Sequence, residues 1–205
     1  MSTHCRFLLA IAVLMACAGP SATWLYDGSD AQMLGVPVIT NSNCKWAAAP
    51  FEVDFDCYAT TIGAAASRAG GPRDAGFDVY ITSTLSGLPG SAIAKLPQPL
   101  VPLNPGYNYY YGALDAPVLL TAGTVYALVF IPTSPDLSAS LSFGAEPGSY
   151  YGQGTGDNGA TWFELVFPLA VRVDGHAVPE PSSMAGILVS VLGWGMSRKR
   201  KKPVS

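Results

Sequence analysis

The sequence predicts an all-β fold, an antiparallel β-sandwich or jelly roll, with one helix before it and one after it. Short runs rich in β-branched and aromatic residues recur along the chain, and turn signals of Gly, Pro, Asn and Asp separate them. The 205 residues are 49% hydrophobic and 12% charged, a composition that fits neither a coiled coil nor a disordered chain. We therefore expect one domain with its own core, in which regularly spaced short strands form two sheets.

Two runs show the strand signal most clearly. Residues 77–82 (FDVYIT) alternate in side-chain character, and residues 124–131 (TVYALVFI) form the continuous apolar run typical of a buried strand. Residues 64–68 (AAASR) have high helix propensity, but the run is too short to be helical without packing, so we predict strand there. In chain order, the predicted strands cover residues 36–40, 50–58, 60–67, 77–82, 91–96, 107–112, 116–120, 124–131, 139–144 and 162–173.

The N-terminal helix is predicted to be a signal peptide, residues 1–22. Arg6 precedes an apolar run at residues 7–16, and small residues flank Cys17 where signal peptidase would act. As a helix the run reaches only about 15 Å, half of the hydrocarbon core of a bilayer. We expect cleavage after Ala18 or Ala22, with lipidation of Cys17 as an open alternative. The secretion machinery and signal peptidase would be its partners.

The C-terminal segment, residues 176–205, combines three features in a specific order. A Pro-Glu-Pro motif comes first, an apolar stretch predicted to span the membrane follows at residues 183–197, and a basic cluster ends the segment. Even counted from Ser182 to Ser197, the stretch would reach about 24 Å, less than the core of about 30 Å, and the basic cluster would stay in the cytoplasm. The motif is Val178, Pro179, Glu180, Pro181 and Ser182, and the basic cluster is Arg198, Lys199, Arg200, Lys201 and Lys202.

This order resembles the PEP-CTERM sorting signal of exported bacterial proteins. The resemblance implies that a membrane-embedded enzyme of the exosortase type recognises the motif in the inner membrane of a Gram-negative-type bacterium. The enzyme would release the domain to the cell surface or extracellular matrix, and whether the tail is removed stays open. Residues 77–96 also resemble the strand, turn and strand unit of choice-of-anchor ectodomains, which implies a β-sandwich for residues 23–175 and no particular activity.

Charge is distributed asymmetrically along the chain. Five of the 11 Lys and Arg residues lie in the basic cluster, whereas 13 of the 14 acidic residues lie between the two terminal segments. Nucleic-acid binding requires clustered cations that neutralise phosphates. We therefore expect no nucleic-acid partner for the domain.

Two cysteines, Cys44 and Cys57, remain after removal of the signal peptide. The expected compartment is oxidising, so we predict a disulfide between them. In the chain-entropy model, closing a loop of this length would contribute about 3 kcal/mol. A metal or redox pair fits less well, because 12 residues separate the two cysteines.

The sequence contains few groups that could serve catalysis. After signal removal the remaining histidine is His176, which we expect in the linker before the sorting signal, so a Ser-His-Asp set is not predicted. We therefore predict that the protein is not an enzyme and needs no cofactor. A small hydrolase built on carboxylates stays open, with Glu52, Asp54, Asp56, Asp78 and Glu164 as the available acids.

Residues 51–56 alternate apolar and acidic side chains. On one strand, this alternation would place three carboxylates on one face and three apolar side chains on the other. The acidic face would be exposed to solvent or, as an alternative, would bind calcium, because hard cations prefer clustered carboxylate oxygens. The acidic residues are Glu52, Asp54 and Asp56, and the apolar ones are Phe51, Val53 and Phe55.

Residues 155–162 match the pattern [Ser/Thr]-x-Asp-x-Gly-x-Thr-Trp and resemble an Asp-box. The resemblance implies a stable hairpin turn, in which Asp157 bonds the turn backbone, Gly159 takes a positive φ and Trp162 tucks beneath. Propellers of the sialidase type repeat this unit several times, so a single copy does not predict that fold. The matching residues are Thr155, Asp157, Gly159, Thr161 and Trp162.

Tyrosines supply the remaining candidate surface. Sugar rings stack on aromatic faces that have amides nearby, such as Gln153; alternatively, alternate tyrosines simply pack the sandwich.

The sequence therefore predicts an exported, non-enzymatic structural or adhesion component of surface polysaccharide or biofilm, with a carbohydrate- or calcium-binding module as the alternative. The candidate ligand-binding residues are Tyr107, Tyr109, Tyr111, Tyr150 and Tyr151.

Overall fold

The computed structural model describes residues 23–27, 44–142, 151–165 and 168–178. Within these ranges the chain is all-β, as predicted, and it contains no helix, hence none that could cross a membrane. The predicted signal peptide and membrane segment lie outside the described residues. The strands are β1 (Thr23–Asp27), β2 (Trp46–Glu52), β3 (Cys57–Gly70), β4 (Phe77–Leu85), β5 (Leu88–Lys95), β6 (Asn108–Leu120), β7 (Val125–Pro132), β8 (Ser138–Leu141), β9 (Gln153–Thr155), β10 (Phe163–Glu164) and β11 (Val171–Ala177).

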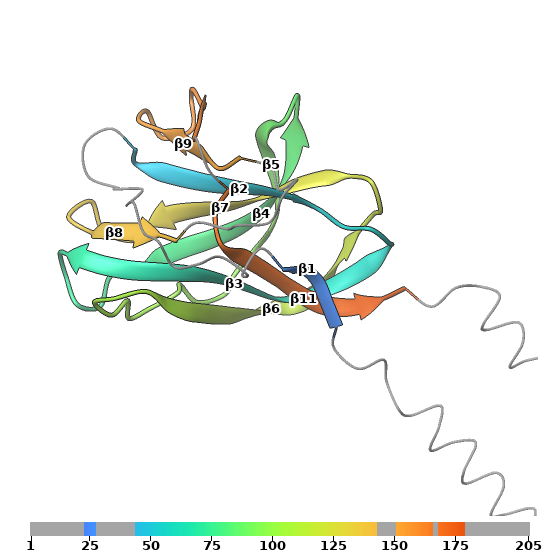
Figure 1. Cartoon of the computed structure of the whole chain (residues 1–205), viewed down its shortest axis with the longest axis horizontal. Coiled ribbons are helices and arrows are strands. Elements are labelled where there is room, and N and C mark those ends of the chain that lie inside the picture. Colours follow the sequence, from blue (N-terminus) through green and yellow to red (C-terminus); the bar gives the residue numbers. More distant parts are fainter. Residues whose placement is uncertain (1–22, 28–43, 143–150, 166–167, 179–205) are drawn as a thin grey trace, which may run out of the picture.

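The strands form two antiparallel sheets. The first sheet has the order β1-β11-β3-β6, with β8 also paired to β3, and the second has the order β10-β9-β2-β7-β4-β5. Figure 1 shows the two sheets as stacked layers, with β2 and β7 in one layer and β3, β6 and β11 in the other. Such stacking of two antiparallel sheets is the arrangement of a β-sandwich.

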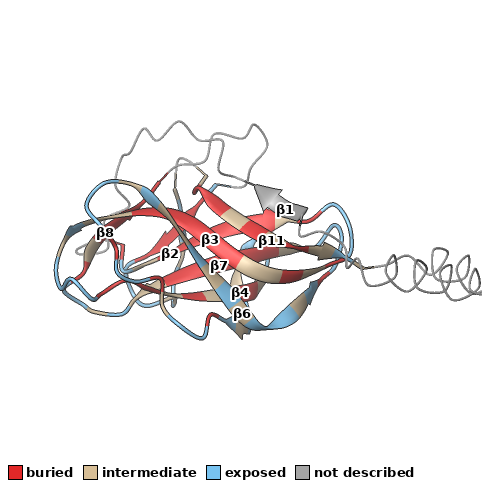
Figure 2. Ribbon diagram, turned by 90° about the horizontal axis from the view of Figure 1, so that it is seen from below, coloured by how far each residue is buried: buried red, intermediate tan, exposed pale blue. Residues whose placement is uncertain are grey.

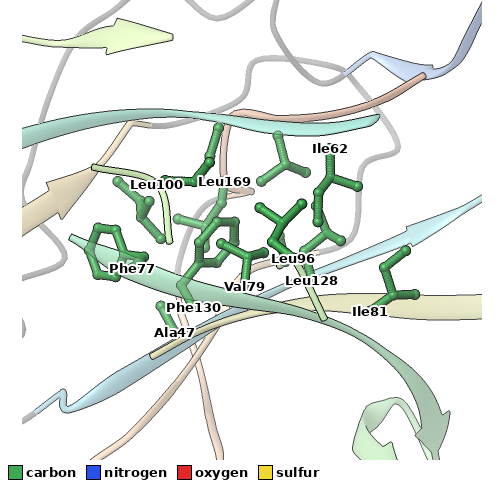
Figure 3. Packing of buried hydrophobic residues seen from close by; sticks show 14 of the residues in the cluster. Ala47, Ile62, Phe77, Val79, Ile81, Leu96, Leu100, Leu128, Phe130 and Leu169 are labelled. Atoms are coloured by element: carbon green, nitrogen blue, oxygen red, sulfur yellow. The ribbon is translucent and has the colours of Figure 1, made fainter. Parts of the chain in front are cut away.

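The core lies between the two sheets. It is built from the inward-facing side chains of both, with Phe130 and Phe77 from the second sheet meeting edge to face at a centroid distance of 6.0 Å. Ile62 of β3 reaches the same cluster from the first sheet (Figure 3). Fully burying one such side chain stabilises a fold by about 1.5–3 kcal/mol, so this layer of buried side chains holds the two sheets together.

A second, smaller apolar cluster lies on the outer face of the second sheet. Ala47 and Ala49 of β2 belong to the main core, whereas Ala48 packs with Ala127 and Val129 of β7 in the smaller cluster. Successive side chains of a strand point to opposite faces, which places this cluster on the far side of the sheet from the core. Part of the outer face of the second sheet is therefore buried as well.

Several predicted strands are confirmed. The run at 64–68 is strand, and the two clearest predicted strands correspond to β4 and β7. The predicted strands at 107–112 and 116–120 are one continuous strand, β6, which pairs with β3 on both sides of the expected break, while residues 114–117 bulge out of that pairing. Strands at 60–67 and 91–96 correspond to β3 and β5, β8 covers the start of 139–144, and the predicted strand at 36–40 lies outside the described residues.

The predicted single strand at residues 50–58 is wrong, because a turn separates β2 from β3. Two backbone groups at the start of the β6 to β7 loop hold this turn: Gly123 N donates to Val53 O at 3.1 Å, and Ala122 N donates to the Asp56 carboxylate at 2.9 Å. The partners are more than 60 residues apart in the chain, so the alternating pattern contains no sign of them.

The predicted single strand at residues 162–173 is also wrong. Its two ends form β10 and β11, which belong to different sheets. The sequence does not predict the short strand β9, to which β10 pairs. Neither strand is longer than three residues, too short for a period of two to be recognised.

The predicted strand, turn and strand unit at residues 77–96 is present as the β4–β5 hairpin, with a turn earlier than expected. Leu85 pairs with Leu88, and the two central residues, Ser86 and Gly87, have φ values of 53° and 81°. Two positive φ values are required by the tight turn that matches strand twist. Leu88, and the Pro89-Gly90 pair after it, therefore belong to β5.

His176 lies in β11 and not in a linker, which corrects the sequence-based expectation. It pairs with Tyr58 of β3, and the two rings lie 5.6 Å apart. The next described residue, Val178, donates its backbone N–H to Asp56 O at 2.9 Å. The sandwich thus continues past residue 175 to the first residue of the predicted sorting motif, whose remaining residues lie outside the described part.

Candidate ligand-binding surfaces

Two tyrosines form an aromatic surface on the outer face of the first sheet. Tyr109 and Tyr111 are two residues apart on β6, so both point to the same face, and their rings stack at 6.1 Å with an interplanar angle of 19°. On β3 they face Ala65 and Gly63, small residues that leave room for the rings. Tyr111 keeps 48% of its surface exposed. We call this pair the tyrosine platform.

A charged pair lies beside the tyrosine platform. Arg172 of β11 pairs with Gly63 on the opposite side from Tyr111, so the three residues form one row across the sheet. The Arg172 Nε atom lies 3.7 Å from a carboxylate oxygen of Asp174. The aromatic surface therefore has two charged side chains beside it, of which 13% and 19% of the surface is exposed. Figure 2 shows that β6 is the more exposed part of this sheet and β3 the more buried part.

The neighbouring Tyr110 and the predicted residues Tyr107 and Tyr150 are not part of the platform. Tyr110 turns toward the core, and its hydroxyl accepts a hydrogen bond of 2.6 Å from the Asn104 backbone, which holds the turn before β6. Tyr107 is half-buried and precedes β6. Tyr150 lies outside the described residues. The packing interpretation therefore holds for Tyr110, whereas Tyr111 is exposed and Tyr109 is half-buried on the outer face.

Tyr151 lines a separate cleft on the second sheet. The β4–β5 and β9–β10 hairpins rise on the same side of this sheet (Figure 1) and bound an open cleft of about 380 Å³. Its described lining includes Pro50, Leu88, Tyr151, Gln153 and Glu164. Sequence reasoning finds Tyr151 and Gln153 as part of a binding surface and Glu164 only as an available acid, and it misses Pro50 and Leu88, because only the folding of the hairpins brings these segments together. We call this feature the hairpin cleft.

The Asp-box-like turn supports one wall of the hairpin cleft. Asp157 accepts hydrogen bonds from the Thr155 hydroxyl at 2.6 Å, the Thr161 hydroxyl at 2.6 Å and the Thr161 backbone at 2.8 Å. These bonds stabilise the charged carboxylate and lower the pKa of Asp157 to about 2. Gly159 has φ 88°, and Trp162 packs on the outer apolar cluster. The turn joins β9 to β10 and so fixes the positions of the two strands.

The predicted row of three carboxylates is not formed. β2 ends at Glu52, Val53 is buried, and Phe55 is 40% exposed, so the alternation does not continue to Asp56. Within the described ranges, no group of three or more His, Cys, Asp or Glu side chains is arranged to hold a metal ion. The other candidate acids lie elsewhere: Asp78 pairs with Lys95 at 2.9 Å, and Glu164 lines the hairpin cleft, while Asp54 lies in the turn after β2.

The predicted disulfide is wrong in this structure, where both thiols are free and buried. Cys44 precedes β2 and Cys57 begins β3, so the whole of β2 lies between them. Its seven residues span about 20 Å, whereas a disulfide requires Cα atoms within about 7 Å. Burial raises the pKa of both thiols, that of Cys57 to about 11, which disfavours the thiolate form.

Comparison with known proteins does not assign the chain to a family. No protein-family model matches it, and no curated protein matches it. The function therefore has to be argued from the terminal segments and from the two surfaces just described, the tyrosine platform and the hairpin cleft.

Proposed function

We propose that this chain is an exported protein of the cell surface or extracellular matrix of a Gram-negative-type bacterium, where it binds polysaccharide as a non-enzymatic structural or adhesion component. The stacked pair Tyr109 and Tyr111 is the observation that carries the binding part of this proposal. The order of motif, apolar stretch and basic cluster after residue 177 carries the sorting part.

The tyrosine platform suits a sugar chain for physical reasons. The C–H faces of sugar rings pack on aromatic rings, and the stacked pair, with centroids 6.1 Å apart and the Tyr111 ring exposed, offers an apolar surface for such packing. Arg172 and Asp174 on the same face supply a donor and an acceptor for ring hydroxyls. The platform lies on an open sheet face, so a long polymer can cross it without having to enter a pocket.

The sorting part of the proposal follows from the terminal segments. In it, residues 1–22 form a signal-peptide helix, residues 183–197 cross the inner membrane once, and an exosortase-type enzyme acts at the motif Pro179 to Pro181. Both outer faces of the sandwich would then be presented outside the cell. The basic cluster at 198–202 would hold the tail on the cytoplasmic side until release.

Affinity electrophoresis in gels containing the host's own extracellular polysaccharide tests the binding part. Replacing one ring of a stacked pair removes about 0.5–1.5 kcal/mol, so Tyr111→Ala is expected to weaken retention by about 2- to 10-fold. Tyr107→Ala is the matched control and should migrate like the wild type. Equal retention of the Tyr111→Ala and wild-type proteins would refute the platform.

Intact mass of the protein from membrane and extracellular fractions tests the sorting part. The expected extracellular species begins after Ala18 or Ala22 and ends near the motif at residues 178–182. Glu180→Ala should accumulate in the membrane fraction with its basic cluster retained. An extracellular species that still carries residues 198–202 would contradict release at the motif.

A further inference from the structure

The hairpin cleft is enclosed by walls, whereas the tyrosine platform is an open surface. Its floor is formed by strands of the second sheet, including Pro50 of β2, and its walls by two hairpins, so it encloses a ligand on more than one side. At about 380 Å³ it is within the range of about 300–1,000 Å³ that is typical of small-molecule sites. Tyr151, 52% exposed, and Leu88 supply apolar surface beside it.

Gln153 contributes a hydrogen-bond acceptor that has no use within the described fold. The residue is 9% exposed, and its Nε2 atom donates to Gly87 O at 2.7 Å, a bond that ties β9 to the tip of the β4–β5 hairpin. The Oε1 atom of the same amide is buried and finds no partner among the described residues. Buried polar atoms are normally paired, so an unpaired acceptor in the lining of a cleft indicates a ligand that brings a donor.

The charge of the cleft narrows the class of ligand. Glu164 is exposed at its edge, and none of the described residues that line the cleft is Lys, Arg or His. The lining therefore offers acceptors, an aromatic ring and an apolar floor, but no cation to neutralise an acid. Ligand hydroxyl or ammonium groups fit this set, whereas a ligand carboxylate would be repelled by Glu164.

We propose that the hairpin cleft is a second glycan site, which binds one uncharged or amine-bearing sugar residue and rejects uronic acids. The sugar ring packs on Tyr151, and its hydroxyls donate to Gln153 Oε1 and to the Glu164 carboxylate. The site lies on the opposite outer face from the tyrosine platform, and neither its residues nor its test depends on the platform. A sandwich with a glycan site on each face would link two polysaccharide strands.

Saturation-transfer NMR on the exported protein tests this site, with glucose, galactose, mannose, glucosamine and glucuronate as probes. We expect transfer to at least one neutral hexose and to glucosamine, and binding of glucuronate about tenfold weaker or more. Tyr151→Ala should weaken neutral-sugar binding by about 2- to 10-fold, whereas Tyr151→Phe should retain it. Glu164→Gln should remove the discrimination against glucuronate.

The controls separate this site from the platform and from misfolding. Tyr111→Ala should leave transfer to the monosaccharides unchanged, even where it weakens retention by the polysaccharide. Gln153→Met should abolish binding, and the exposed positions Tyr151 and Glu164 keep the test valid if that variant loosens the hairpin. No transfer to any of the sugars, unchanged binding by Tyr151→Ala, or equal binding of glucose and glucuronate would each overturn the proposal.

Discussion

Gly63→Ala tests how closely the Tyr111 ring lies over β3. Gly63 lies directly opposite Tyr111 in the first sheet, and an added Cβ would lie 2.5 Å from Tyr111 Cδ1, 2.7 Å from Cε1 and 2.9 Å from Tyr110 O. The first two atoms belong to a side chain that can rotate away, whereas the third is backbone. The substitution should therefore displace the ring and strain the strand slightly.

Two opposing effects decide the size of this change. Removing a glycine from a strand interior stabilises by about 0.5–1 kcal/mol, because the unfolded chain loses freedom. Overpacking of the kind expected at Gly63 costs about 1–3 kcal/mol. The steric cost is the larger of the two, so we expect a net loss of about 1 kcal/mol. Gly70→Ala on the same strand is the matched control, since its Cβ would meet only Ser138 Cβ at 3.7 Å, and it should be neutral or stabilising.

Urea unfolding of a double-mutant cycle measures the effect. In a Tyr111→Ala background two of the three close contacts are gone, so Gly63→Ala should cost less there, with a coupling of about 0.5–1 kcal/mol. Gly63→Ala should also weaken retention in polysaccharide gels, because the ring leaves its place in the platform. If Gly63→Ala costs the same in both backgrounds, or stabilises as much as Gly70→Ala, the ring does not lie over β3 as described.

Three further results are expected. Because Cys44 and Cys57 are free thiols, the intact mass should show no loss of 2 Da, and a reductant should leave the midpoint of unfolding unchanged. A disulfide between them would instead contribute about 3 kcal/mol to the free energy of unfolding, which the reductant would remove. The pKa of Asp157, about 2, lies below its unfolded value of 3.8, so the charged carboxylate stabilises the fold fully above about pH 4, and this contribution is lost as the pH falls through 2. Over this pH interval the thermal midpoint of Asp157→Asn should therefore fall less than that of the wild type. Parallel curves for the two proteins would contradict the hydrogen bonds to Asp157. Phe130→Ala should lower the free energy of unfolding in urea by about 3–5 kcal/mol, because the ring of Phe130 is fully buried. Phe55 is 40% exposed, so Phe55→Ala should lower it by less than about 1 kcal/mol. Similar losses for the two variants would show that the core is not where the structure places it.

The two strands with the clearest sequence pattern, β4 and β7, have one face or both faces buried along most of the run. In β7 an unbroken apolar run is buried on both sides, and in β4 the alternation between core and outer face is regular. The pattern fails at residues 53–56, because hydrogen bonds from the β6 to β7 loop produce that turn. It fails again at β9, where three residues pair with β2 only because the Asp-box-like turn positions them.

The candidate binding residues also divide into those that the sequence pattern predicts and those that depend on distant contacts. The Tyr109 and Tyr111 pair can be read from their spacing of two, since side chains alternate along any strand. The unpaired Gln153 Oε1 cannot, because it depends on a hairpin tip some 66 positions away in the chain. The cysteines show a different error: the two remaining cysteines and the expected oxidising compartment suggest a bond, but the whole of strand β2 lies between the two residues.

Local patterns in the chain thus suffice for the all-β class, for most strands and for the Asp-box-like turn, because each depends on neighbours within a few residues; the terminal signals stay a prediction. The two free thiols, the position of His176 in β11, the loss of the carboxylate row and the walls of the hairpin cleft depend on which distant strands pack together. That choice is made by the burial of side chains from both sheets in one core, and a linear pattern does not contain it.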